Sequence, residues 1–298
     1  MMSSLDSAEL LALDWGTTSV RAYRLAKGGA VVARRHDGRG AFKLSPEDFR
    51  AVLDDLAASL GAQRLPVLAC GMAGAREGWA PAPYLPCPIG LEDLARATLS
   101  PADRPDVRIV PGVCLTAETL GDVMRGEEVQ ALGVEAPAER FTVLAPGTHS
   151  KWIRREGDRI TGFRTFLTGE LFAALKDASL MGRGMEPPGQ NDRAFLDGVR
   201  LGFDDPAVTA TLFQVRVRRL AGTLDGAGSA DLMSGILIGA EMAAGLCEVE
   251  DPVVLVGTPA LTARYALALE ALGHPAAQVV DSEMAVAAGL HRLWRALA

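Results

Sequence analysis

The chain has 298 residues, 49% of them hydrophobic and 22% charged, which favours two folded domains and excludes a disordered or collagen-like chain. The formal net charge of −7 disfavours nucleic acid as a partner, because a negative surface repels a phosphate backbone. The longest stretch without a charged residue, 78–91, contains four prolines and is shorter than the about 20 residues of a membrane-spanning helix, so we expect no membrane partner.

Apolar runs bounded by glycine and proline alternate with amphipathic stretches rich in alanine and leucine, which is the pattern of an α/β protein. Ser45 before Pro46, with acids in the next two positions, marks one helix start clearly. In chain order the pattern predicts strands 10–13, 20–25 and 31–33, helix 46–60, strand 66–70, helix 91–99, strand 108–110, helix 126–132, strands 141–144 and 152–154, helices 169–180, 192–203, 207–220 and 229–246, strand 253–256, and helices 261–272 and 282–298.

Two further features concern the compartment and the cysteines. The first Lys or Arg is Arg21, so the chain lacks the positive segment of a secretory signal, and we expect a cytoplasmic protein. The four cysteines form no C-x-x-C pair and have no histidine at zinc-ligand spacing. We interpret them as small core residues rather than metal ligands: Cys70, Cys87, Cys114 and Cys247.

Three predicted strands end in a Gly-Thr pair. Glycine lets the backbone approach an anion, and the following N–H groups and hydroxyls can then donate to phosphate oxygens without a lysine. Asp14 precedes the first pair, where a divalent cation such as Mg²⁺ would be needed between the carboxylate and a phosphate. The first two pairs are each followed by an extended segment, which predicts two β-hairpins with matching roles in two related domains. The alternative, that these are common tight turns and Asp14 an ordinary turn acid, stays open.

Other nucleotide signatures are missing. The chain has no G-x-x-x-x-G-K-[ST] loop, and Gly182-Arg183-Gly184 lacks the third glycine of a dinucleotide fingerprint. Neither G-x-S-x-G nor H-E-x-x-H occurs. Phosphate chemistry in this chain must therefore use the paired hairpins.

These segments carry a resemblance to known proteins. Residues 13–19 and 146–152 resemble the two phosphate motifs of the sugar kinase/actin/Hsp70 superfamily, and 253–258 resembles its adenosine motif. More narrowly, the chain resembles the bacterial 2-dehydro-3-deoxygalactonokinase family over its whole length. The segments that carry this resemblance are 13–19, 71–88, 110–113, 123–133, 146–152, 163–171, 237–241 and 257–265.

The resemblance implies an α/β fold of two actin-like (ribonuclease H-like) lobes with an interdomain nucleotide cleft. It implies that 1–138 form a lobe with the sugar-acid side and the first hairpin, on which the helix 284–298 packs back. Residues 139–283 would form the lobe with the second hairpin and the adenosine motif. The implied activity is ATP-dependent phosphorylation of 2-dehydro-3-deoxy-D-galactonate at its C6 hydroxyl, giving the 6-phosphate and ADP in galactonate catabolism, with Mg²⁺ as cofactor.

A carboxylate must take the proton of the acceptor hydroxyl. Related carbohydrate kinases keep this acid at a helix start shortly before the second hairpin, which in this chain is the stretch 125–133. The resemblance makes Glu127 the base, although glutamate replaces the usual aspartate. Glu128 is the alternative, and only one of the two can face the substrate, since they lie about 100° apart on a helix. Both acids could instead only favour a helix N-terminus.

A keto acid also brings a carboxylate, whose favoured partner is the guanidinium of an arginine. Arg125 and Arg164 rank above Arg76 for this role, although near-motif arginines are often only solvated. The loop 71–84 could turn backbone amides and aromatic rings toward the sugar, or be only a stiff surface loop. The residues expected to bind substrate are Gly71, Met72, Gly74, Arg76, Trp79, Tyr84, Arg125 and Arg164.

The nucleotide and its metal ion are expected at the three Gly-Thr pairs. His149 and Lys151 could touch the transferred phosphate, whereas a lone histidine is more often structural, and Glu170 is expected to be a helix-start acid. The expected cofactor-binding residues are Asp14, also the metal ligand, with Gly16, Thr17, Thr18, Ser19, Gly147, Thr148, His149, Lys151, Gly257 and Thr258.

Four other functions compete with this one. The substrate could be a related 2-keto-3-deoxy acid such as the gluconate epimer, and the fold could serve a non-catalytic sugar or nucleotide sensor. An ATPase that drives filament assembly would release ADP without any sugar. A hydride-transfer enzyme is disfavoured by the missing glycine fingerprint. The sequence leaves a homo-oligomer open.

Overall fold

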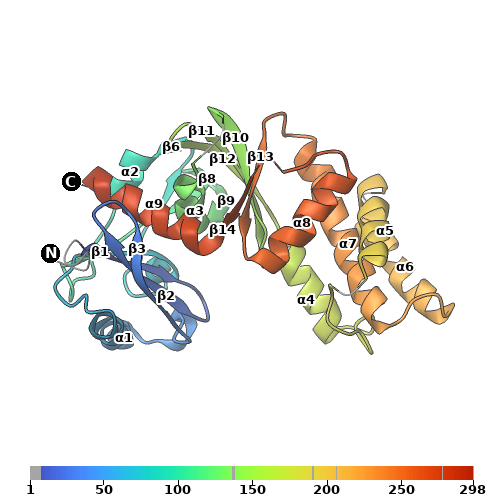
Figure 1. Cartoon of the computed structure of the whole chain (residues 1–298), viewed down its shortest axis with the longest axis horizontal. Helices are drawn as coiled ribbons and strands as arrows, with labels where there is room; N and C mark the ends of the chain where they lie inside the picture. Colours follow the sequence, from blue (N-terminus) through green and yellow to red (C-terminus); the bar gives the residue numbers. More distant parts are fainter. Residues whose placement is uncertain (1–7, 136–137, 190, 206, 277, 298) are drawn as a thin grey trace, which may run out of the picture. The chain divides into compact units, whose positions relative to one another are not determined.

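The computed structural model describes residues 8–135, 138–189, 191–205, 207–276 and 278–297, which divide into two compact units. The first unit holds the described residues up to Glu139, together with Arg154–Phe163 and the described residues from Ser282 onward. The second unit holds Arg140–Ile153 and Arg164–Asp281. The chain changes unit four times, and two of these changes fall within strands, β11 (Ser150–Glu156) and β12 (Arg159–Phe166) (Figure 1).

The first unit is built on a five-stranded sheet of order β3-β2-β1-β4-β7. Strands β1 (Ala8–Trp15), β2 (Val20–Ala26) and β3 (Val31–Asp37) are antiparallel neighbours, while β4 (Val67–Gly71) and β7 (Val107–Ile109) continue the sheet in parallel. Helix α1 (Pro46–Ser59) starts at the predicted Ser45 cap, where Asp48 accepts a hydrogen bond from the Ser45 N–H. The sheet residues Leu11, Leu13 and Trp15 pack with α1 residues in one core.

The C-terminal helix α9 (Ser282–Leu297) packs on this unit, against α3 (Glu127–Gly133), α2 (Leu91–Arg96) and β1. Helices α3 and α9 cross closely because glycines lie at the contact. A Cβ on Gly133 would lie 1.9 Å from the Ala285 carbonyl oxygen, and one on Gly289 would lie 2.0 Å from that of Val129. A small sheet of β5 (Tyr84–Pro86), β8 (Gly112–Thr116) and β9 (Leu120–Met124) leads into α3.

The strands of the second unit lie in the order β14-β13-β10-β11-β12. Strands β10 (Arg140–Ala145), β13 (Val253–Gly257) and β14 (Gln278–Asp281) run parallel, so the ends of β10 and β13 lie at the same edge. Within the first unit, Arg159 and Ile160 of β12 pair with β6 (Ile89–Gly90).

Helix α7 (Gly226–Leu246) is the central helix of the second unit and contacts α4 (Thr168–Ala178), α5 (Asp192–Asp204), α6 (Val208–Leu220) and α8 (Pro259–Ala271). Among the described helices, α7 alone is long and apolar enough to span a membrane, and 72% of its most apolar 18-residue window is buried in the protein. Its apolarity is therefore that of a core helix.

Every predicted strand and helix overlaps an observed element of the same type. The helix predicted at 91–99 is too long: α2 ends at Arg96, the Thr98 hydroxyl donates to the Ala95 carbonyl, and Leu99 pairs with Ile109. Strands β5, β6, β8, β9, β12 and β14 were not predicted.

The expectation for the cysteines holds for two of them. Cys70 and Cys114 are buried, but Cys87 is only half-buried and Cys247 is exposed. Cys247 follows the last residue of α7, where its thiol donates to the Ala244 carbonyl, so its apolar sequence context did not indicate burial.

Candidate functional site

The first Gly-Thr pair lies in the turn of the β1–β2 hairpin, as predicted. The Gly16 N–H donates to the Ser19 carbonyl at 2.8 Å and closes the turn. A second segment holds the turn from outside, since the Ala41 N–H donates to the Gly16 carbonyl at 3.0 Å and the Phe42 N–H to the Thr17 carbonyl at 3.1 Å. The turn 16–19 therefore has a set conformation within the first unit.

Asp14, the predicted metal ligand, lies at the end of β1 with its side chain 14% exposed. Its Oδ2 accepts a hydrogen bond from Arg21 Nη1 at 3.1 Å, and the Cys70 Sγ lies 3.9 Å from its Oδ1. Burial raises the pKa of Asp14, and the neighbouring Arg21 charge opposes this rise. The Nε of Arg21, in turn, lies 3.8 Å from the Oε1 of Glu283.

This donor set fits a magnesium ion that a nucleotide brings with it. Mg²⁺ prefers oxygen ligands and commonly keeps waters and phosphate oxygens beside one or two carboxylates. Asp14 offers one such carboxylate at a strand end. Among the described residues, no group of three or more His, Cys, Asp and Glu side chains could hold an ion without phosphate ligands.

Asp14 lies close to the helix that carries the predicted base. Asp14 and Cys70 are register partners in the parallel pair of β1 and β4, and Gly71 follows at the end of β4. Gly71 has a φ of 78°, and a Cβ there would lie 2.6 Å from the Trp15 carbonyl oxygen, so no other residue fits without strain. A Cβ on Gly126 would lie 3.5 Å from the Gly71 Cα. The ends of β1 and β4 and the start of α3 therefore meet at one edge of the sheet.

The two candidate bases differ in burial. Glu128 is 0% exposed, and both its carboxylate oxygens accept from the Gly126 N–H, at 2.9 and 2.7 Å. Burial, and next the charge of Glu127, raise the pKa of Glu128 to about 8. Glu127 is only half-buried and accepts from the Arg125 N–H at 3.1 Å. Of the two, Glu127 is thus the more accessible carboxylate.

Arg125 lies just before α3 and uses only some of its hydrogen-bond donors. Its guanidinium lies 4.2 Å from the centre of the Tyr84 ring, and Nη2 donates to the Ala82 carbonyl at 2.9 Å. Its Nε and Nη1 are buried and have no hydrogen-bond partner in the described part of the chain. A charged group with unused buried donors is costly unless a ligand uses them.

The other substrate candidates of the first unit differ in burial. The Trp79 ring packs 6.1 Å from that of Trp15 and 5.8 Å from that of Phe49 and is 7% exposed. Packing in this core does not favour contact of Trp79 with the sugar, which stays a prediction. Arg76 is exposed, whereas Met72 and Gly74 belong to a short 3₁₀ turn after β4, with Met72 half-buried and Gly74 buried.

The second Gly-Thr pair lies in the turn between β10 and β11, which also confirms the hairpin prediction. The start of α4 supports this turn: the Glu170 N–H donates to the Thr148 carbonyl at 2.9 Å. A Cβ on Gly169 would lie 2.3 Å from the Gly147 carbonyl oxygen, so the two backbones are in direct contact. Thr148 and His149 are exposed at the turn.

His149 and Lys151 are held by different partners. His149 Nε2 lies 2.5 Å from Glu170 Oε2, so Glu170 is more than a helix-start acid. Lys151 is 4% exposed, and its Nζ donates to the Thr165 hydroxyl at 2.7 Å. The side chain of Lys151 thus runs to the neighbouring strand, and contact of Lys151 with the transferred phosphate stays a prediction.

The third Gly-Thr pair ends β13 and starts α8. Gly257 is buried, Thr258 is exposed at the N-cap, and Pro259 is the first helical residue. A Cβ on Gly257 would lie 3.8 Å from the Pro146 side chain. The second and third pairs therefore lie at the same edge of the second unit.

Arg164 of the second unit already has an acidic partner. Its Nη1 lies 2.7 Å from Glu248 Oε1, and its guanidinium lies 5.0 Å from the centre of the Phe166 ring. The sequence prediction ranked it level with Arg125. Arg164 is paired with Glu248, whereas Arg125 has two buried nitrogens without a partner among the described residues.

Two charged residues were missed by sequence reasoning. Arg21 holds Asp14, and the signal was its position across the hairpin, where the register pairs it with Asp14. Glu241 is buried behind the second hairpin. Its one signal in the sequence is that it ends the segment 237–241, which carries part of the family resemblance.

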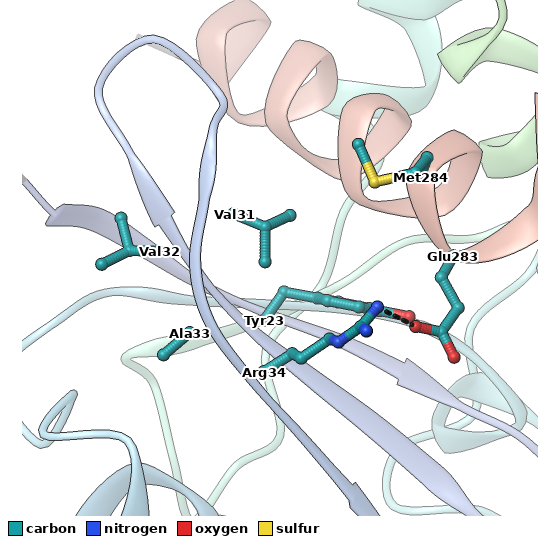
Figure 2. Close-up of a pocket in the computed structure, with 7 residues that line it drawn as sticks. All are labelled: Tyr23, Val31, Val32, Ala33, Arg34, Glu283 and Met284. Atoms are coloured by element: carbon teal, nitrogen blue, oxygen red, sulfur yellow. Dashed lines mark hydrogen bonds and ion pairs between the residues drawn. The ribbon is translucent and has the colours of Figure 1, made fainter.

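The first unit also has a groove that no predicted site residue lines. It has a volume of about 330 Å³ and lies between β2, β3 and the start of α9 (Figure 2). Arg34 and Glu283 form an ion pair at 3.1 Å within it. Its residues are Tyr23, Val31, Val32, Ala33, Arg34, Glu283 and Met284.

Two relatives are similar to this chain over nearly its whole length. A Rhizobium meliloti (strain 1021) protein described as a 2-dehydro-3-deoxygalactonokinase is 40% identical over 299 residues, covering 96% of each chain. The Escherichia coli (strain K12) 2-dehydro-3-deoxygalactonokinase is 35% identical over 294 residues, covering 98% of this chain and 99% of the relative.

Solved structures share the fold. A Sinorhizobium meliloti crystal structure, also described as a 2-dehydro-3-deoxygalactonokinase, matches with a TM-score of 0.90 at 37% identity, over 97% of this chain and 99% of that one. The Clostridium difficile activator of 2-hydroxyisocaproyl-CoA dehydratase, with bound ADPNP, matches with a TM-score of 0.52 at 14% identity, over 96% and 95%, which shows the fold alone. This is the α/β fold of the actin-like ATPases and sugar kinases, as expected. A family model for 2-keto-3-deoxy-galactonokinase matches residues 14–293, and the chain therefore belongs to that family.

Proposed function

We propose that the protein phosphorylates 2-dehydro-3-deoxy-D-galactonate at its C6 hydroxyl with ATP, giving the 6-phosphate and ADP. The family match over residues 14–293 and the names of the two relatives support this carbohydrate kinase activity. The single observation that carries the proposal is geometric. Asp14, Gly71 and the start of α3 with Glu127 meet at one sheet edge, where a carboxylate base lies near a carboxylate suited to a metal ion.

Glu127 accepts the proton of the acceptor hydroxyl as the new phosphate ester forms. Its accessibility supports this role over Glu128, whose raised pKa leaves it largely protonated at neutral pH. Glu128 instead satisfies the Gly126 N–H and keeps the first turn of α3 in place.

Arg125 holds the carboxylate of the keto acid. Two of its nitrogens are buried and have no partner among the residues that the structure describes, and it lies two residues from Glu127, which supports this assignment. The Tyr84 ring and the Ala82 carbonyl keep the guanidinium in place.

The nucleotide binds at the three Gly-Thr pairs, with phosphates at the two hairpins and the adenosine near Gly257 and Thr258. Asp14 would hold the Mg²⁺ of the nucleotide, which supplies positive charge for the transferred phosphate when bound. The bound ADPNP in the Clostridium difficile protein, which has the same fold, supports ATP as the donor. We place the reaction in the cytoplasm, where ATP is made and used.

ADP release measured against a panel of 2-keto-3-deoxy acids tests the proposal. We expect the galactonate epimer to give the highest kcat/KM, with the product identified as the 6-phosphate by mass spectrometry and NMR. Preference for the gluconate epimer would change the substrate but keep the activity. ADP release that is independent of any sugar acid, or none with the whole panel, would contradict the proposal.

A further inference from the structure

A buried carboxylate lies behind the second hairpin and accepts four side-chain hydrogen bonds. Glu241 on α7 is 2% exposed. Its Oε1 accepts from Ser150 Oγ at 2.6 Å and from Trp152 Nε1 at 2.9 Å. Its Oε2 accepts from Thr168 Oγ1 at 2.5 Å and from Tyr265 Oη at 2.8 Å. All five residues belong to the second unit.

This arrangement is not what core packing alone requires. A buried carboxylate is costly unless hydrogen bonds or a counter-charge compensate it, and an apolar side chain of similar size often serves stability equally well. The partners of Glu241 within the described ranges are four neutral donors and no basic side chain. Burial raises the pKa of Glu241, while these four hydrogen bonds oppose the rise.

The four donors come from the elements that form the proposed nucleotide contacts. Ser150 and Trp152 open β11 directly after the turn 147–149. Thr168 begins α4, whose Glu170 N–H holds the Thr148 carbonyl. Tyr265 lies on α8, the helix that starts after Gly257-Thr258. Glu241 thus contacts the hairpin, the helix that supports the hairpin, and the helix of the third Gly-Thr pair.

Thr148 and His149 are exposed, so the turn has little packing of its own and residues outside it must hold its conformation. Backbone donors that bind phosphate must be held to within about 0.5 Å, and the residues behind them usually supply this order. We propose that Glu241 is a positioning residue that holds the second hairpin, α4 and α8 in the arrangement that receives the ATP phosphates. This inference rests on the proposed nucleotide role of the hairpin.

The test compares Glu241→Gln with two further variants. The glutamine amide can keep its oxygen toward Trp152, whose indole N–H can only donate. Its nitrogen can then donate to the hydroxyls of Thr168 and Tyr265. The variant therefore keeps the shape of the side chain and removes its charge. Ser150→Ala removes one donor at the base of the turn and leaves the carboxylate in place. Met233→Ala is the control, since Met233 is a fully buried α7 residue whose core cluster contains none of the four residues that donate to Glu241.

We expect the KM for ATP to rise about tenfold in Glu241→Gln and less in Ser150→Ala, with the KM for the keto acid unchanged within about twofold. Amide exchange at 147–149, measured without nucleotide, should be at least about tenfold faster in Glu241→Gln than in the wild type. Met233→Ala should lower the melting temperature but leave the KM for ATP and the exchange at 147–149 unchanged.

Two results would overturn the inference without contradicting the kinase activity. The first is that neither the KM for ATP nor the amide exchange at 147–149 changes in Glu241→Gln and Ser150→Ala. The second is that the KM for ATP rises as much in Met233→Ala as in Glu241→Gln. A wild-type protein that neither binds ADP in calorimetry nor releases it would overturn the proposed function, and the inference with it. Faster amide exchange at 147–149 together with a raised KM for ATP, seen only in the Glu241 and Ser150 variants, supports the proposed function and the inference.

Discussion

Among single residues, Glu127 carries the sharpest prediction. Glu127→Gln should lower kcat by about 10²–10⁴-fold, because the amide cannot accept the hydroxyl proton, and should leave the affinity for ATP unchanged. Steady-state ADP release and calorimetric titration with a non-hydrolysable ATP analogue measure the two quantities. Glu128→Gln is the matched control and should retain most of the rate. A loss in Glu128→Gln with an active Glu127→Gln would assign the base to Glu128.

Glu128 itself should make stability depend on pH. Its pKa is raised from 4.5 to about 8 in the folded state, so the folded protein holds a proton that the unfolded chain releases between these values. The free energy of unfolding contributed by this group is therefore highest below pH 4.5 and falls as the pH rises toward 8, by about 1.4 kcal/mol for each unit of pKa difference.

Glu128→Gln removes this group and should show a weaker decline. Urea unfolding of both proteins at pH 5, 6.5 and 8 measures the difference, and Glu241, a second buried carboxylate with a raised pKa, contributes equally to both. Parallel declines in the two proteins would show that Glu128 does not titrate in this range.

At the scale of elements, the short helix α3 depends on its surroundings. Seven residues cannot form a stable helix alone. The buried Arg155 donates to the carbonyls of Ala131 and Val134 at its C-terminal end, and Arg292 donates to that of Leu132. Burial lowers the pKa of Arg155 to about 10, which still leaves it charged at neutral pH. The position of Glu127 is therefore set by tertiary contacts of α3.

Gly289→Ala should disturb this helix and its base together. The added methyl group would lie 2.0 Å from the Val129 carbonyl oxygen, so α3 and α9 must separate, at a cost of about 1–3 kcal/mol in the free energy of unfolding. We expect kcat to fall as well, because α3 carries Glu127. Gly28→Ala, where nothing lies within 4 Å of the added Cβ, is the control and should be within about 0.5 kcal/mol of wild type. Equal effects of the two substitutions would refute the close crossing.

For the whole molecule, the prediction concerns nucleotide binding by both units. Magnesium ADP at about 100 times its Kd should raise the free energy of unfolding by about 2.7 kcal/mol. Because the proposed contacts include turn 16–19 in the first unit and turn 147–149 in the second, amide exchange should slow in both. Omitting Mg²⁺, or Asp14→Asn, should reduce the protection at 16–19. Protection restricted to one turn, or no dependence on Mg²⁺, would contradict the proposed contacts.

The sequence predicted the regular elements well because their signals are local. Alternation, capping at Ser45 and Gly-Pro boundaries act within a few residues, and every predicted element overlaps an observed one. The missed strands β5, β6 and β14 have two to four residues, too few for an alternation pattern. Strand β12 has eight residues, but Thr161, Gly162 and Arg164 interrupt its apolar residues, so it contains no continuous apolar run.

The same limit applies to the site. The sequence by itself determined the three Gly-Thr turns, Asp14 beside the first, and the Glu127-Glu128 pair, since each is a short motif whose chemistry follows from adjacent residues. Only the tertiary structure decided that Glu128 is buried and Glu127 accessible, that Trp79 belongs to the core, that Lys151 runs to Thr165, and that Glu241 gathers four donors. The physical reason is that burial and hydrogen-bond partners depend on which distant segments pack together, and no local pattern encodes those neighbours.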